Sequence, residues 1–191
     1  WGIEEAKGSN SEIRTELRLD DRPYAICVGR IEHAKGTLGL LNFWRTMRGR
    51  VKGNHRLVLL GEPSVPIEQD DDVVVVRGAD DDTKWSLLRD ADFLINPSAM
   101  ESFSLVLFEA WAAGIPVLVN GYCDTTREHV AEATGGLWYR NYGEFEVAVE
   151  RLATDQELRL RLAANGQTFA AEVYGWTNIV DRFTAFCEQL S

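Results

Sequence analysis

Cysteine is scarce in this sequence, which has only Cys27, Cys123 and Cys187. The three are far apart, odd in number, and form no Cys-x-x-Cys pair. A disulfide framework and a cysteine-based zinc site are therefore both disfavoured. Reduced thiols in a cytosolic protein are the simplest interpretation.

Basic residues and long apolar runs are also in short supply. Lys and Arg number 20 against 30 Asp and Glu, which gives a formal net charge of −10. Nucleic acids and anionic membranes bind clustered positive charge, so we expect neither as a partner.

No apolar run approaches the roughly 18–20 residues of a membrane span, and the N-terminus lacks a signal pattern. A Walker motif and a Gly-x-Gly-x-x-Gly fingerprint are both missing, which disfavours ordinary P-loop and NAD-binding sites.

What the sequence has instead is a series of short, nearly continuous apolar runs. Such runs are typical of parallel strands that are buried on both faces. Between them, apolar residues recur at spacings of three and four, as on one face of a helix. This alternation predicts an α/β fold, with a parallel sheet of about six strands and helices on both faces. The predicted strands cover residues 24–28, 57–60, 73–76, 93–95, 116–119 and 137–139, and the predicted helices lie within residues 38–51, 85–88, 105–112, 145–152 and 180–190.

The length of 191 residues suggests one domain. Residues 1–22 are polar and irregular, and we interpret them as the remnant of an interdomain linker. Residues 23–191 carry the predicted strands and helices and form the domain itself. Because the sequence begins with Trp1 and not with Met, we expect it to be part of a longer protein.

Two acidic triplets, at residues 70–72 and 80–82, raise the possibility of a metal site, and Asp90 with Asp92 adds a third Asp-x-Asp match. The first triplet precedes a predicted strand. The second opens a predicted helix, where Asp caps unpaired N–H groups. No His or Glu is placed to complete a coordination shell, so we interpret these residues as solvated loop and helix-cap carboxylates and expect no metal.

Two cations follow the first predicted strand. This strand ends at Gly29-Arg30, and Lys35-Gly36 comes just before the next helix. Gly29 allows a close backbone turn, and the cations stand at the carboxyl edge of the sheet beside a helix N-terminus. A diphosphate suits that position. The alternative is that Arg30 only pairs with Glu32 on the surface.

The segment from Asn96 to Ala110 is the most informative in the chain. A predicted strand ends at Asn96, and a helix begins near residues 102–104, where its first N–H groups form an anion-binding site. Glu101 lies in the loop and Glu109 in the helix, with seven residues between them. Glu109 has apolar neighbours and needs a partner, because an unpaired buried charge is costly. Ribose hydroxyls would serve as that partner; the alternative is a Glu on the outer face of the helix.

These motifs together resemble the nucleotide-sugar-binding half of retaining GT-B glycosyltransferases of family 4, often called group 1. The similarity runs from about residue 23 to residue 190. The family pattern is Gly-Arg, Lys-Gly, Pro-Ser, Glu-x7-Glu and Ala-x-x-x-Gly-x-Pro-Val. In this chain the corresponding residues are Gly29-Arg30, Lys35-Gly36, Pro97-Ser98, Glu101 with Glu109, and the segment 110–117.

The resemblance implies a role for each matching residue. Arg30 and Lys35 contact the donor diphosphate, Glu101 holds sugar hydroxyls, and Glu109 holds the ribose hydroxyls. The backbone N–H groups that meet the sugar and the distal phosphate belong to Phe103, Ser104 and Leu105. Of these residues, we expect Glu101, Arg30 and Lys35 to be catalytic.

The resemblance also leads to predictions for three further positions. Many family members have Gly where this chain has Ser104, and Ser is permitted there if its φ is negative. Trp111 replaces a common Met and is expected to pack in the core. His129 is expected to be a helix-end or packing residue.

The resemblance also implies a whole-protein context. The fold pairs two Rossmann-like domains, and this chain is the donor-binding half. Its partner is the missing N-terminal domain, which binds the acceptor, and the stripe at residues 180–190 resembles the helix that returns toward it. Members transfer a hexosyl group from a UDP- or GDP-sugar with retention of the anomeric configuration, usually without a metal. The nucleotide sugar is a substrate, and we expect no cofactor. We expect a cytoplasmic parent, with peripheral attachment at the inner membrane face left open, and a fragment that is inactive in transfer by itself.

The resemblance gives the chemistry an electrostatic character. Arg30, Lys35 and the helix N-terminus stabilise the charge on the departing diphosphate, so Glu101 and Glu109 are not a glycosidase dyad. Other functions stay open. The main alternative is a regulatory module that binds a nucleotide sugar without transferring it, and a GT-B phosphorylase or epimerase is a related enzyme.

Overall fold

The computed structural model describes residues 14–15, 19 and 21–189. Most of the linker remnant predicted for residues 1–22 lies outside the described residues. The domain predicted for residues 23–191 lies almost entirely within the described residues.

Six strands form a single sheet in the order β3-β2-β1-β4-β5-β6, and every neighbouring pair is parallel. The predicted strands agree with the observed ones to within one residue at each end. The apolar runs therefore predicted the sheet correctly, because all six strands lie between helical layers. Their bounds are β1 (Tyr24–Val28), β2 (Arg56–Leu60), β3 (Val73–Val76), β4 (Phe93–Asn96), β5 (Val117–Asn120) and β6 (Gly136–Tyr139).

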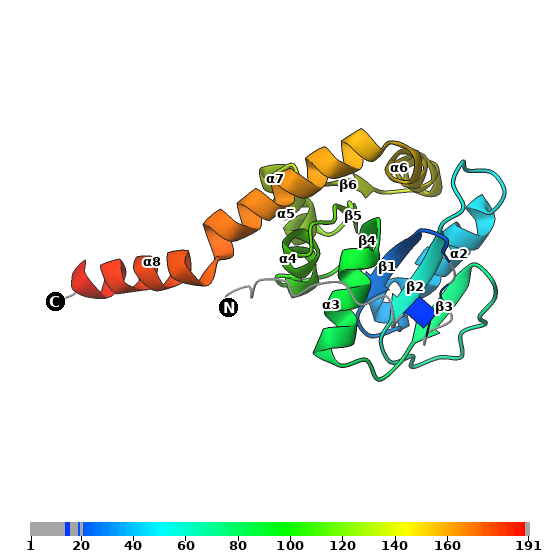
Figure 1. The fold of residues 1–191 in the computed structure, drawn as a ribbon, viewed down its shortest axis with the longest axis horizontal. Coiled ribbons are helices and arrows are strands. Elements are labelled where there is room, and N and C mark those ends of the chain that lie inside the picture. Colours follow the sequence, from blue (N-terminus) through cyan, green and yellow to red (C-terminus); the bar gives the residue numbers. More distant parts are fainter. Residues whose placement is uncertain (1–13, 16–18, 20, 190–191) are drawn as a thin grey trace.

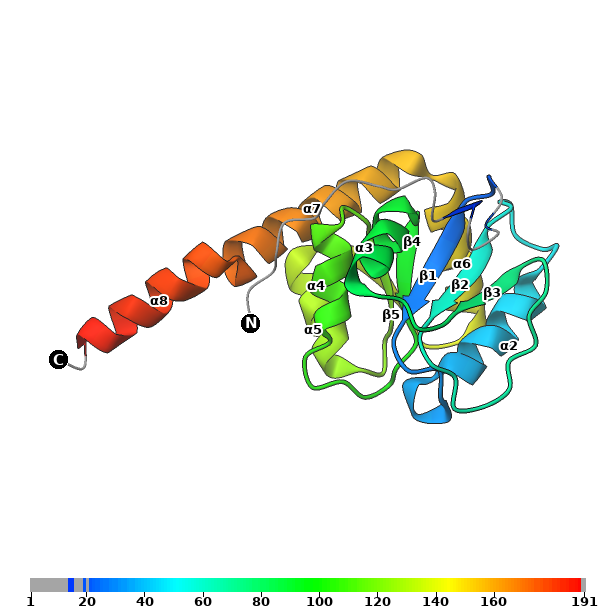
Figure 2. The ribbon, with the colours of Figure 1, turned by 60° about the horizontal axis from the view of Figure 1, so that its bottom comes forward.

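Helices cover both faces of this sheet (Figures 1 and 2). One core cluster joins the sheet to α2 and α6, and a second joins its other face to α3, α4 and α5, with α7 contributing to both. The fold is therefore the expected Rossmann-like α/β architecture. The helical elements are η1 (His33–Lys35), α2 (Thr37–Met47), α3 (Asp81–Asp90), α4 (Leu105–Ala112), α5 (Asp124–Ala133), α6 (Tyr142–Thr154), α7 (Gln156–Tyr174) and α8 (Trp176–Gln189).

The helices show where periodicity misled the prediction. Helix α2 ends at Met47, so Val51 does not extend its apolar face. The predicted helices did not include α5 or α7, the longest helix in the described part. Helix α7 contains Asn165-Gly166, two residues of low helix propensity. Gly166 lies where α7 packs against Trp111, and a Cβ there would overlap the indole ring. The glycine therefore serves close packing and does not break the helix.

The direction in which successive strands are added to the sheet reverses between β1 and β4. Strand order runs outward from β1 through β2 to β3 on one side, and from β4 to β6 on the other. At such a switch point the loops after the two central strands diverge and leave a crevice at their carboxyl ends, where open α/β sheets bind ligands. Both predicted motifs follow these two strands.

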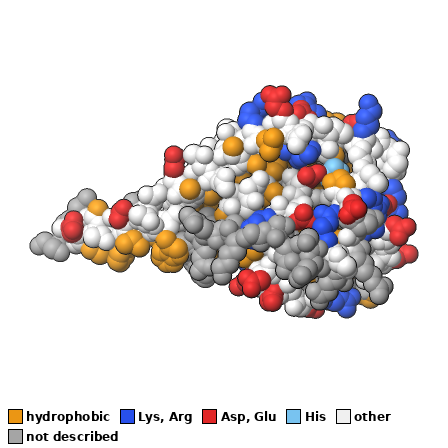
Figure 3. Space-filling model, viewed as in Figure 1, with side chains coloured by type: hydrophobic (Ala, Val, Ile, Leu, Met, Phe, Trp, Pro, Cys, Tyr) orange, Lys and Arg blue, Asp and Glu red, His pale blue; other side chains and the backbone are white. Residues whose placement is uncertain are grey.

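Helix α8 extends away from the rest of the domain (Figures 1 and 2). Four large apolar side chains on it are more than half exposed: Trp176, Val180, Phe183 and Phe186. Figure 3 shows hydrophobic side chains along one edge of this projecting part. The predicted stripe is thus present as far as Cys187, whereas Leu190 lies outside the described residues. Within the described part of the chain, no helix is long and apolar enough to cross a membrane.

Candidate functional site

The loops after β1 and β4 meet at a contact between two backbones. Gly36 has φ +73°, in the left-handed region, and a Cβ on it would overlap the carbonyl oxygen of Pro97. Only glycine combines that conformation with so close an approach. The Lys-Gly and Pro-Ser motifs are therefore packed directly against each other, which brings Lys35 to the loop that carries Glu101.

A cavity of about 270 Å³ opens where these loops meet. Its walls include the loop after β1, the loop after β4 and the first turns of α4. Six of the seven predicted site residues line it: Arg30, Lys35, Glu101, Ser104, Leu105 and Glu109. The fold thus brings together residues that are spread over eighty positions of the sequence.

Lys35 and Glu101 form an ion pair inside the cavity. The Lys35 ammonium lies 3.0 and 3.1 Å from the two carboxylate oxygens of Glu101. The side chains are 33% and 15% exposed, so the pair is partly shielded from water. This contact holds both groups at the wall of the cavity, which the first turns of α4 also line.

Arg30 is held more loosely. Its guanidinium lies 3.2 Å from the Glu32 carboxylate, and its side chain is 72% exposed. The surface pairing that sequence reasoning kept as an alternative is therefore present. Exposed pairs of this kind contribute about 0–1 kcal/mol, so an anion in the cavity can compete for the guanidinium.

Helix α4 begins with an unusual residue. Ser104, its N-cap, has φ +68° and ψ +70°, so this position holds a Ser although the condition of a negative φ is not met. The Asn96 side-chain amide donates a hydrogen bond of 2.8 Å to the Ser104 hydroxyl. That contact helps to hold a non-glycine residue in the left-handed region, which costs about 1–2 kcal/mol. Ser104, Leu105 and Val106, at the start of α4, line the cavity, and the first N–H groups of a helix have no partner within it.

Glu109 has a protein partner that sequence reasoning missed. The Lys84 ammonium, from α3, lies 2.9 Å from Glu109 Oε1. Lys84 also lies 3.1 Å from Asp81, one turn earlier in the same helix. The proximity of Asp81 and Lys84 was visible in the sequence, but the pairing between α3 and α4 depends on tertiary packing and gave no sequence signal.

A second cavity of about 280 Å³ adjoins the first. The two share Val28 and Gly29 as lining residues, and the second extends to the loops after β2 and β3. Gly78 and Ala79, in the loop after β3, line this second cavity, whereas Arg77 does not. Together the two cavities follow the carboxyl ends of β3, β2, β1 and β4.

The Phe103 side chain turns away from the cavity. Its ring stacks on Phe108 at 4.8 Å and meets the edges of His129 and Tyr174. His129 thus packs as expected, and desolvation lowers its pKa below the ordinary value. Only the backbone of Phe103 remains a candidate for ligand contact.

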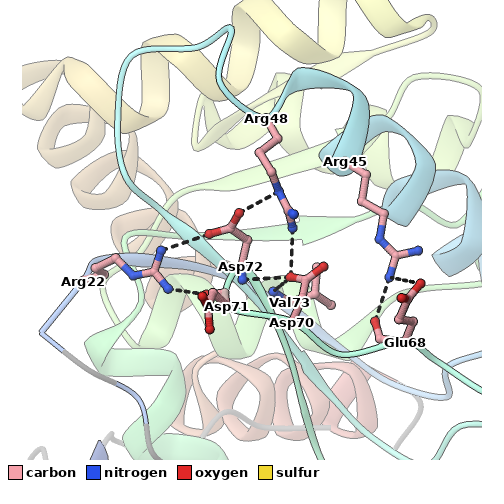
Figure 4. Close-up of polar contacts among 8 residues, drawn as sticks. All are labelled: Arg22, Arg45, Arg48, Glu68, Asp70, Asp71, Asp72 and Val73. Atoms are coloured by element: carbon pink, nitrogen blue, oxygen red, sulfur yellow. Dashed lines mark hydrogen bonds and ion pairs between the residues drawn. The ribbon is translucent and has the colours of Figure 1, made fainter.

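The acidic triplets are engaged with protein groups. Arg22 and Arg48 form ion pairs with Asp72 at 2.9 and 2.6 Å, and Arg48 reaches Asp70 at 2.8 Å (Figure 4). In the second triplet, the Asp80 side chain accepts the N–H of Thr83 and caps α3, as predicted. No group of three or more His, Cys, Asp or Glu in the described part of the chain is placed to hold a metal ion. Asp70 and Asp72 of the first triplet are thus ion-paired, where solvated carboxylates had been expected.

Comparison with known proteins places this chain in a family. A family model for glycosyl transferases group 1 matches residues 9–169. The chain belongs to the group 1 glycosyltransferase family. The resemblance expected from the motifs is therefore correct at this level, and the sheet matches the halves of GT-B glycosyltransferases.

Individual relatives agree with this assignment. A GDP-mannose-dependent alpha-(1-6)-phosphatidylinositol monomannoside mannosyltransferase of Mycobacterium tuberculosis is 25% identical over 93% of this chain and 50% of its own length. Among solved structures, Anabaena HepE in complex with UDP-glucose has a TM-score of 0.75 at 16% identity, covering 94% of this chain and 52% of its own. The C-terminal domain of a group 1 family protein from Francisella tularensis has a TM-score of 0.69 at 19% identity, covering 88% of this chain and 95% of its own. The group 1 chain described here spans about half the length of the curated relatives that it matches.

Proposed function

We propose that this chain is the donor-binding, C-terminal half of a retaining glycosyltransferase that transfers a hexosyl group from a UDP- or GDP-sugar. One observation carries the proposal: six predicted donor contacts from two distant motifs line a single cavity at the switch point of the sheet. The match to a solved C-terminal domain over most of both chains supports the position within the parent. The printed ligands and donors of the relatives, UDP-glucose and GDP-mannose, support the substrate class.

In this proposal the diphosphate binds between the two loops. Lys35 and Arg30 contact its oxygens, and the N–H groups at the start of α4 bind the distal phosphate. A helix N-terminus and paired cations are a favourable setting for an anion, even in a chain with a net charge of −10. Without ligand, Lys35 pairs with Glu101 and Arg30 pairs with Glu32. When the diphosphate binds, its oxygens replace these carboxylates as partners of the two cations.

The same groups then act on the reaction. Negative charge grows on the departing diphosphate, and fixed cations and N–H dipoles next to it lower the barrier. Glu101 contacts the sugar hydroxyls and orients the sugar, while Glu109 binds the ribose and the base occupies the second cavity. Positioning and charge stabilisation carry this mechanism, with no acid–base dyad. Metal independence is part of the proposal, and unchanged nucleotide affinity in EDTA would support it.

The acceptor side belongs to a domain outside this chain. We propose that the exposed apolar face of α8 packs on that domain, since four large apolar side chains otherwise remain in water. The chain by itself then binds the donor without transferring its sugar.

Titration calorimetry with UDP, GDP and their sugars tests the proposal. We expect binding of at least one nucleotide family in the micromolar to millimolar range. Glu109→Ala should weaken the nucleotide most, whereas Arg30→Ala should weaken diphosphates more than nucleosides. Lys52→Ala, which removes an exposed cation outside the cavity, is the control. No binding of any of these ligands at millimolar concentration contradicts the proposal, and equal losses for diphosphate and nucleoside contradict the role of Arg30.

A further inference from the structure

The ion pair between Lys84 and Glu109 joins two helices at the junction of the two cavities. Glu109, on α4, lines the first cavity, and Lys84, on α3, lines the second. Their closest atoms are 2.9 Å apart, and the side chains are only 22% and 26% exposed. The pair therefore lies inside the nucleotide region and not on the outer surface of the helices.

Lys84 is firmly charged in this position. Burial by itself would lower its pKa, but hydrogen bonds and charge from Glu109 and Asp81 outweigh that effect and raise the pKa above its ordinary value. Asp81 is 88% exposed and contributes little as an anchor. The contact that constrains the ammonium is thus the one to Glu109, and the contact equally constrains the Glu109 carboxylate.

The pair leaves Glu109 able to bind a ligand. Lys84 contacts Oε1, and a carboxylate has two oxygens with about four acceptor positions in all. A ribose offers two neighbouring hydroxyl donors, and a carboxylate accepts both only if its plane is correctly oriented. A salt bridge to one oxygen fixes that plane before the ligand binds, which lowers the ordering cost of binding.

We propose that Lys84 is a positioning residue that holds the Glu109 carboxylate for the ribose diol and so makes the site select ribonucleotides over 2′-deoxyribonucleotides. This inference rests on the proposed nucleotide-binding function. The fixed carboxylate receives two hydrogen bonds from a ribose but only one from a 2′-deoxyribose. A carboxylate without Lys84 can rotate, so it gains less from the second hydroxyl.

The test compares UDP with dUDP, and GDP with dGDP, by titration calorimetry. The wild-type chain should bind the ribonucleotide at least about tenfold more tightly, as expected for one hydrogen bond to a charged group. Lys84→Met should reduce this ratio to about threefold or less, and Lys84→Arg should retain most of it. Lys52→Met changes the net charge equally at an exposed position and should leave the ratio at its wild-type value.

The ratio distinguishes positioning from a merely structural role. A variant that only loses stability weakens both nucleotides equally, so an unchanged ratio in Lys84→Met overturns the inference. If Lys84→Met does not fold by circular dichroism, Lys84→Ala, which likewise removes the donor to Glu109 Oε1, replaces it with the same expected loss of selectivity. Wild-type binding of UDP or GDP with no selectivity against the deoxy form overturns this inference alone. Failure of wild-type chain to bind either nucleotide overturns the proposed function as well.

Discussion

Replacing Gly36 by Ala should damage both the fold and the site, because Gly36 joins the two loops that form the cavity. The left-handed conformation at φ +73° costs a residue with a Cβ about 1–2 kcal/mol. The new Cβ also overlaps the Pro97 carbonyl oxygen, which belongs to the backbone and can yield only if a loop shifts. Overpacking of this kind costs about 1–3 kcal/mol, so we expect a total loss of about 2–5 kcal/mol.

The chain contains a matched control for this substitution. Gly49 has φ +74°, and a Cβ on it would meet no atom within 4 Å. Gly49→Ala therefore carries the conformational cost alone, about 1–2 kcal/mol. The difference between the two variants measures the contact between the loops.

Urea unfolding and nucleotide calorimetry on both variants provide the measurement. Gly36→Ala should be less stable than Gly49→Ala by about 1–3 kcal/mol and should bind nucleotide more weakly, whereas Gly49→Ala should bind like wild type. Equal stability of the two variants, or unchanged nucleotide affinity in Gly36→Ala, would refute the argument that this contact builds the site.

Substitutions at three further positions test other parts of the structure. Ser104→Ala loses the Asn96 hydrogen bond but keeps the left-handed strain, so it should lose about 1 kcal/mol in urea unfolding, whereas Ser104→Gly removes both and should stay near zero. Trp111→Phe removes the buried indole hydrogen bond to a backbone carbonyl and should cost about 1–3 kcal/mol in the same assay; a change under 0.5 kcal/mol would count against that bond. Burial alone would raise the pKa of Asp92, but the 2.6 Å contact with His55 and the nearby Arg159 charge lower it overall. The ionised Asp92 therefore stabilises the folded state fully above pH about 4, and this contribution is lost as the pH falls through the lower pKa of the folded state. Asp92→Asn should make the stability of the protein decline less steeply in acid. An unchanged slope of the unfolding midpoint against pH would contradict this.

The sequence was sufficient to predict the sheet and most of the cavity. Continuous apolar runs predicted all six strands, because strands buried on both faces leave no alternative in so short a length. The two motifs were expected at the carboxyl edge of the sheet, and the structure brings Lys35 to Glu101 there. Both predictions follow from the direction of parallel strands, which needs no detailed packing.

Several of the missed features depend on contacts between distant segments. Helix α7 was not predicted; within it Gly166, a residue of low helix propensity, allows close packing on Trp111. The partner of Glu109 was expected to be a ligand, whereas Lys84 reaches it from a neighbouring helix. Ser was thought to be permitted at position 104 only with a negative φ, but Ser104 has a positive φ and its hydroxyl accepts a hydrogen bond from Asn96. In each case the deciding atom lies far along the chain or in another element.

The central claim is that the cavity between the loops after β1 and β4 binds a nucleoside diphosphate sugar. Two-dimensional NMR of backbone amides during titration with UDP-glucose and GDP-mannose tests it most directly. We predict that the largest shifts fall on Gly29 to Gly36 and on Phe103 to Val106. Saturable shifts confined to another surface, such as the groove beside Trp138 and Val147, or no shifts at millimolar ligand, would contradict the account.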